Sequence, residues 1–106
     1  MHQVSLVQLA SFMAVVTHGG VSAAARHLSY SQSSVTLHIQ GLEHALDAQL
    51  FHRERGRLHL TDAGRRLSLL APTLLSMADS LSSCISERVG SPVPEADAGR
   101  PDVTVS

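Results

Sequence analysis

A cluster of small polar side chains lies in the run SQSSVTLHIQ, residues 31–40. Glutamine can pair bidentately with adenine, and serine or threonine hydroxyls can bond to bases or phosphates. The start of a helix also favours a phosphate. Composition alone is equally compatible with ordinary helix caps and surface residues. If this run forms a helix, it presents a set of candidate DNA contacts: Ser31, Gln32, Ser33, Ser34, Thr36, Leu37, His38 and Gln40.

Arginines follow closely behind this run. All eight basic residues are arginine, and five of them lie between Arg53 and Arg66. The formal net charge is −1, but residues 1–70 carry six arginines against four acidic residues. Because phosphate affinity depends on local potential, this cluster can serve a DNA-binding protein despite the near-neutral total. The candidate phosphate contacts are Arg53, Arg55 and Arg57.

Three helices are expected to position the polar run. Apolar residues at helical spacing predict a first helix over 5–18, which Gly19-Gly20 ends. Ser22 is the expected N-cap of a short helix over 23–28. A turn at Ser29-Tyr30 then leads to a third helix over 32–46, capped by Ser31. Two helices joined by a tight polar turn are typical of a helix-turn-helix, whose second helix enters the DNA major groove.

A hairpin and a long helix complete the expected fold. Residues 54–57, with Gly56 supplying the turn, predict a hairpin tip, and 58–60 alternate as a short strand. Thr61 caps the last helix, in which Pro72 is expected to cause a local kink. The fold class predicted is mainly α: a winged helix-turn-helix with a two-stranded wing and a long C-terminal dimerisation, or linker, helix.

The last helix carries apolar residues at steps of three and four. Such a narrow stripe predicts a helix–helix seam, and therefore a homodimer. We divide the chain into a DNA-binding domain at 1–64, a linker and dimerisation helix at 65–88, and a flexible tail or the start of a missing domain at 89–106. The expected dimerisation residues are Leu67, Leu70, Leu74, Ala78, Leu81 and Ile85.

Composition excludes several classes of protein. The chain has 106 residues, 43% of them hydrophobic and 16% charged, which suits one packed domain. No unbroken apolar run approaches the roughly 18 residues of a membrane span, so we expect no membrane partner. The first residues lack the charge and apolar pattern of a signal peptide. With a single cysteine, Cys84, a reducing cytoplasm is expected.

A set of residues occurs along the chain in a recognisable order: Leu9-x-x-Phe12, Gly20, Ala24-Ala25-x-x-Leu28, Ser31-Gln32-Ser33, Ile39-x-x-Leu42-Glu43, Leu50-Phe51-x-Arg53 and Leu60-Thr61-x-Ala63-Gly64. This pattern resembles the N-terminal domain of LysR-type bacterial transcriptional regulators. The resemblance covers residues 6–86 without gaps. It implies a winged helix-turn-helix that dimerises through its linker helix and binds an imperfect palindrome in a promoter.

The resemblance also assigns roles to single positions. Gln32, Ser33 and Thr36 fall where the family contacts bases or phosphates, and Arg53 falls where the wing contacts the DNA backbone or minor groove. Leu37 replaces a frequent arginine or lysine, which removes a polar contact but could bring a thymine methyl into reach. Family members carry a larger C-terminal domain that senses a small molecule. We expect no such inducer to bind this chain.

Other chemistry has less support. Seven histidines are present, but none pairs at ligand spacing with another ligand on a predicted helix, so we expect no metal site and no cofactor. Motifs of nucleophilic catalysis and phosphate loops are absent from the sequence, so we expect no enzyme. Two alternatives stay open: a truncated interaction module that dimerises with a full-length regulator without productive DNA binding, and a redox switch through Cys84.

Overall fold

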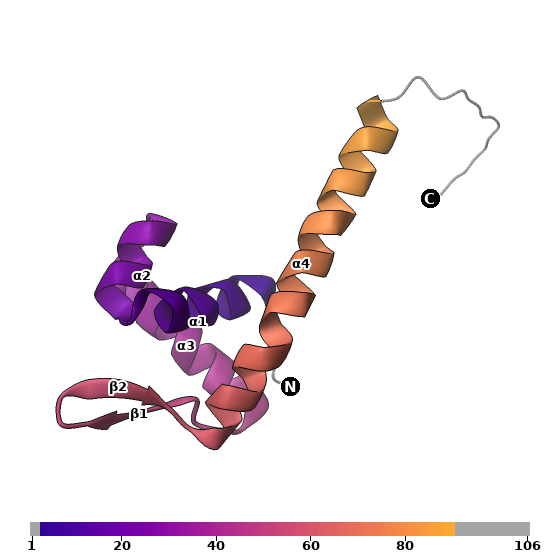
Figure 1. Cartoon of the computed structure of the whole chain (residues 1–106). Coiled ribbons are helices and arrows are strands. Elements are labelled where there is room, and N and C mark those ends of the chain that lie inside the picture. The colour runs from indigo at the N-terminus through magenta and orange to yellow at the C-terminus, as the bar shows by residue number, and fades with distance from the viewer. Residues whose placement is uncertain (1–2, 91–106) are drawn as a thin grey trace. The chain divides into compact units, whose positions relative to one another are not determined.

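The computed structural model describes residues 3–90 of the chain. It divides into two compact units, Met1–Leu75 and Ser76–Ser106. The mainly α, winged helix-turn-helix class predicted from the sequence is confirmed. The elements, in chain order, are α1 (Leu6–His18), α2 (Val21–Leu28), α3 (Gln32–Leu46), β1 (Phe51–Glu54), β2 (Arg57–Leu60) and α4 (Asp62–Gly90) (Figure 1).

Local capping explains where α1 begins and ends. The backbone N–H of Gln8 donates to Ser5 Oγ at 3.1 Å, while the N–H of Ser5 donates to Gln8 Oε1 at 3.0 Å. This capping box satisfies two N–H groups that would otherwise have no partner. Gly19 ends the helix at a φ of 84°, a left-handed conformation that glycine adopts without steric cost.

The start of α2 differs from the prediction. The helix begins at Val21 after Gly20, which makes no side-chain capping bond, so Ser22 lies inside the first turn and is not the N-cap. The predicted cap of α3 is confirmed, because Ser31 Oγ accepts from the N–H of Ser34 at 3.1 Å. The bounds of α3, Gln32–Leu46, are those predicted.

One hydrophobic core holds α1, α2 and α3 together. Phe12, Val35 and Leu42 are fully buried, and the rings of Phe12 and Phe51 lie 5.3 Å apart between centroids. Where α2 meets this core, Ala24 and Ala25 are buried, and their small side chains permit a close approach between helices. The core thus fixes α3 against two other helices.

The end of α3 is tied to the start of the hairpin. The N–H of Leu50 donates to the Glu43 carboxylate at 2.8 Å. Asp47 ends α3 with a φ of 53°. Aspartate tolerates this left-handed conformation better than most residues. These contacts set the direction in which the chain enters β1.

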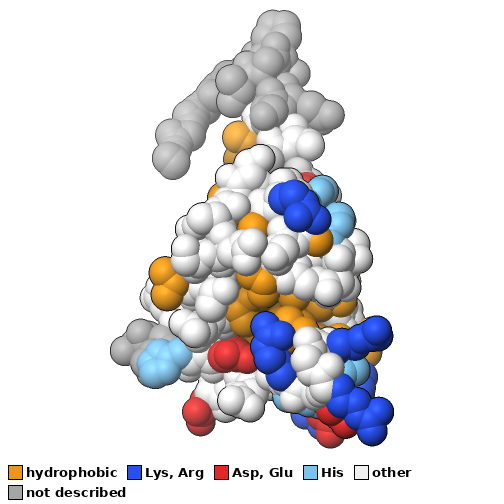
Figure 2. Space-filling model, turned by 90° about the vertical axis from the view of Figure 1, so that its left-hand side faces the viewer, with side chains coloured by type: hydrophobic (Ala, Val, Ile, Leu, Met, Phe, Trp, Pro, Cys, Tyr) orange, Lys and Arg blue, Asp and Glu red, His pale blue; other side chains and the backbone are white. Residues whose placement is uncertain are grey.

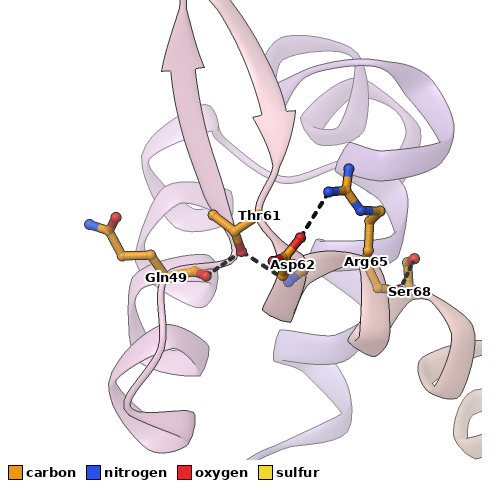
Figure 3. A network of polar contacts seen from close by, with 6 residues as sticks. Gln49, Thr61, Asp62, Arg65 and Ser68 are labelled. Atoms are coloured by element: carbon orange, nitrogen blue, oxygen red, sulfur yellow. Dashed lines mark hydrogen bonds and ion pairs between the residues drawn. The ribbon is translucent and has the colours of Figure 1, made fainter.

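Thr61 joins the hairpin to α4, as Figure 3 shows. Its hydroxyl donates to the Gln49 carbonyl and accepts from the N–H of Gly64 at 3.0 Å, so the predicted cap is confirmed. Arg65 forms an exposed ion pair with Asp62 at 2.9 Å. A Cβ at Gly64 would collide with the carbonyl oxygen of Leu50. Glycine at this position therefore permits the close approach of helix and strand.

The apolar residues of α4 fall into two groups. In the first unit, Ala71 is fully buried, and Leu67 packs against the core. Leu67 is half-buried against the core, so less of its side chain is free for a dimer seam than the sequence suggested, and its role in dimerisation stays a prediction. The large hydrophobic residues left exposed in the described part of α4 are Leu69, Leu70, Leu74, Met77, Leu81 and Ile85.

Within the described residues, one helix is long and apolar enough to cross a membrane, judged by length and composition only: the segment Asp62–Ile85 of α4. It contains no unbroken apolar run of that length, so run length alone did not indicate it. Only 6% of its apolar window is buried within the structure, so it lacks the burial of a core helix. The absence of a membrane partner stays a prediction.

Candidate nucleic-acid interface

The start of α3 presents a group of serine hydroxyls. Besides capping the helix, the Ser31 hydroxyl donates to Ser34 Oγ at 2.9 Å and lies 3.4 Å from Ser33 Oγ. Ser34 is half-buried, so these bonds engage it within the protein, whereas Gln32 and Ser33 are exposed. Of the predicted contacts in this turn, Gln32 and Ser33 thus have the most accessible polar groups.

The outward face of α3 carries most of the other predicted contacts. Thr36, Leu37 and Gln40 are exposed, whereas Val35 and Ile39 on the opposite face are buried. This division follows from the helical period of 3.6 residues per turn. The face is polar except for Leu37, whose side chain is 65% exposed.

His38 differs from its predicted place on this face. It is half-buried, and its Nδ1 is hydrogen bonded at 2.8 Å to the hydroxyl of Ser11, a fully buried residue of α1. The ring of Tyr30 contacts the His38 ring edge-on, with 5.4 Å between the two ring centroids. His38 is therefore better described as a residue that fixes the rotation of α3 against α1 than as a direct DNA contact.

The β1–β2 hairpin holds the three predicted arginines. Its strands pair antiparallel with Glu54 opposite Arg57, so Arg55 and Gly56 form a two-residue turn. Both take positive φ, 55° and 76°, the backbone that matches the twist of a tight hairpin. Arg53, Arg55 and Arg57 are all exposed. A short, well-defined hairpin thus presents three permanent charges.

A cleft of about 580 Å³ brings the hairpin and the two helix starts together. Gly20 and Ser22 at the start of α2, Gln32 at the start of α3, and Arg53 and Arg57 of the hairpin line it. Among the described residues, none that lines this cleft is acidic. Arginine side chains gather at the foot of the face shown in Figure 2. The unsatisfied N–H groups and the partial positive charge of a helix start favour anions, as the arginines do.

A second groove, of about 300 Å³, lies between α3 and the hairpin. Thr36 and Gln40 of α3 line it together with Arg53 of β1. Residues predicted separately, from the polar run and from the arginine cluster, thus share one groove. Glu43 also lines it, and its carboxylate is engaged by the N–H of Leu50.

Sequence reasoning did not predict the contacts that support this interface. Glu43 and Gly64 were matched to the family pattern without a role, and Ser11 was not singled out. Their partners lie 7, 14 and 27 positions away, and no local pattern indicates such pairs. Within residues 3–90, no group of three or more His, Cys, Asp or Glu side chains is placed so that it could hold a metal ion.

Comparison with known proteins gives the interface its context. The chain is 38% identical over 76 residues to the HTH-type transcriptional regulator SoxR of Arthrobacter sp. (strain TE1826), covering 72% of this chain and 26% of the relative. It is 41% identical over 68 residues to the HTH-type transcriptional regulator YofA of Bacillus subtilis (strain 168), covering 64% and 24%. The chain therefore spans about a quarter of the length of these curated relatives.

Solved structures agree with the sequence relatives. The DNA-binding domain of BenM, solved as a complex with the catB site 1 DNA, matches with a TM-score of 0.76 and 30% identity over 82% of this chain and 98% of that chain. The DNA-binding domain of CbnR, also solved with DNA, matches with a TM-score of 0.72 and 30% identity, covering 80% of this chain and 98% of that chain. The model of the lysR family of bacterial regulatory helix-turn-helix proteins matches residues 6–65. The chain belongs to the LysR family and contains its helix-turn-helix DNA-binding domain.

Proposed function

We propose that this chain binds double-stranded DNA as a dimer and recognises an imperfect palindrome in a promoter. The exposed face of α3 lies in the major groove, where Gln32, Ser33, Thr36 and Gln40 contact bases or phosphates. The hairpin lies against the adjacent backbone through Arg53, Arg55 and Arg57. It acts as a transcriptional regulator in the bacterial cytoplasm, where the chromosome is found.

The observation that carries this proposal is the cleft between the hairpin and the starts of α2 and α3. Two arginines and two helix starts converge there, and none of its described lining residues is acidic. DNA carries one charge per roughly 1.7 Å of helix axis, so such a cleft suits its backbone. The domains of BenM and CbnR, whose fold this chain shares, were solved in complex with DNA, which supports DNA as the ligand of this fold.

Dimerisation rests on the exposed apolar residues of α4. Leu70, Leu74, Met77 and Leu81 recur at steps of four, three and four and are 46–64% exposed. Monomeric soluble proteins rarely expose a contiguous apolar patch of this kind. A second copy of the helix is the occupant that a palindromic site requires, because the symmetry of the site mirrors that of the protein.

Selection from a randomised duplex pool, followed by anisotropy titration of the enriched sequence at two salt concentrations, tests the proposal. We expect an imperfect palindrome and a steep fall in affinity with salt. Arg53→Ala should weaken binding to all sequences and reduce the salt slope by about 1. Arg66→Ala is the matched control, since Arg66 is exposed but lines neither groove. No retention at low salt would overturn the proposal.

The second candidate function is an interaction module that pairs with a full-length regulator without productive DNA binding. The apolar exposed face of α4 and the presence of Leu37 in place of a cation favour it. The same titration separates the two functions: a module would dimerise at every salt concentration yet leave DNA unbound. A redox switch through the exposed thiol of Cys84 instead predicts a covalent dimer under oxidant, which Cys84→Ser would abolish.

A further inference from the structure

Leu37 lies at the middle of the outward face of α3. At about 100° per residue, it is about 200° around the helix from Val35, which is fully buried. Ser33 and Gln40, one turn before and after it, are exposed and polar. A single exposed leucine needs no explanation in general. Leu37, however, lies at the centre of the polar face that we propose to contact base edges, and an apolar side chain at that place requires an explanation.

The rotation of α3 that presents Leu37 is fixed by the next residue. His38 is bonded to the buried hydroxyl of Ser11 at 2.8 Å and contacts the ring of Tyr30. Turning α3 so that Leu37 moved toward the core would break this buried bond, which is costly because Ser11 would lose its partner. Leu37 is therefore held outward by the fold.

An aliphatic side chain has few partners in the major groove. It can neither donate nor accept a hydrogen bond, so it does not bind phosphates or the polar edges of guanine, cytosine and adenine. The C5-methyl group of thymine is the apolar feature of a natural base pair in this groove. Pressing leucine against a polar edge would instead desolvate that edge without replacing its bonds.

We propose that Leu37 contacts the methyl group of one thymine in each half-site and so selects thymine at that position. This inference rests on the proposed DNA binding through α3. It differs from that proposal in naming a base, a chemical group and one side chain.

Replacement of thymine by deoxyuridine in the selected operator tests the inference, because the two bases differ only by the methyl group. Each thymine is replaced in turn, in both half-sites together. We expect one position at which affinity falls about 15-fold, which corresponds to about fourfold for each buried methyl. Replacing that thymine by cytosine should weaken binding further, and 5-methylcytosine should recover part of the loss.

Leu37→Ala identifies the side chain that senses the methyl. This variant should bind the thymine and uracil operators equally, and its thermal unfolding should match the parent, since the side chain is exposed. Leu46→Ala is the control: it removes another exposed leucine, at the other end of α3, and should keep the thymine preference.

Three results would overturn the inference. Uracil tolerated at every position, with specific binding intact, would leave the proposed function standing and remove this one. The same holds if Leu37→Ala weakens binding to both operators equally and keeps the preference for thymine. Loss of all DNA binding by the parent protein would remove both.

Discussion

The first compact unit and the later part of α4 both contain many apolar residues, but the first unit buries a core of them whereas the later part of α4 leaves its large ones exposed. In the first unit a hydrophobic core forms within the chain, and Phe12, Leu42 and Leu50 are almost completely buried, although Leu69, Leu70 and Leu74 of α4 stay exposed. From Ser76 onward, Met77, Leu81 and Ile85 are 56–64% exposed. Burying one such side chain contributes about 1.5–3 kcal/mol. The core of the first unit has already gained this stabilisation, whereas the exposed apolar residues of α4 can gain it only from another surface.

Gly64→Ala is expected to damage the first unit most. The new Cβ would collide with the Leu50 carbonyl oxygen, a backbone atom that cannot rotate away. We expect the free energy of unfolding to fall by more than about 3 kcal/mol, as overpacking does when no side chain can yield. Urea unfolding followed by circular dichroism measures it.

Gly41→Ala is the matched control for this variant. A Cβ there meets only the amide end of Gln8, a flexible side chain, although moving it weakens the capping box of α1. Alanine also raises helix propensity by about 1 kcal/mol. We therefore expect a small net change at Gly41. Equal losses at both glycines would contradict the close approach proposed for Gly64.

Local signals predicted much of the first unit correctly. The bounds of α3 and the caps at Ser31 and Thr61 depend on residues within three positions, and they were read correctly from the sequence. The inward placement of His38 and Leu67 was missed, because it depends on Ser11 and on a core that forms only when distant segments meet. The arginines of the hairpin were identified from charge alone, but the cleft that unites them with α2 needs the fold.

Leu81→Glu is expected to act on association and to spare the first unit. A carboxylate at an apolar seam would be desolvated without a partner, so we expect dimerisation to weaken by about 2 kcal/mol, or roughly 30-fold. Sedimentation velocity over a concentration series gives the dissociation constant. Ser83→Glu places the same charge about 200° around the helix and should leave association unchanged. If both variants weaken it equally, net charge explains the effect and the seam does not.

His38→Phe tests the buried bond that orients α3. Phenylalanine keeps an aromatic ring beside Tyr30 but leaves the Ser11 hydroxyl buried without its partner. We expect a loss of about 1–2 kcal/mol in stability. Combining it with Ser11→Ala should recover most of the loss, since removing both partners leaves no unsatisfied group. Additive losses in the double variant would show that the bond contributes nothing.

Asp47→Gly is expected to have the smallest effect, and a stabilising one. Asp47 holds a φ of 53° at the end of α3, where glycine is unstrained. Its negative charge also lies at the negative end of the helix dipole. Removing both penalties should raise stability by about 0.5–1 kcal/mol, or the melting temperature by about 2–8 °C. Asp47→Asn removes only the charge and should give a smaller gain. A melting temperature lowered by glycine would mean that the carboxylate makes a favourable contact that outweighs both penalties, and that this end of α3 is held by more than its backbone.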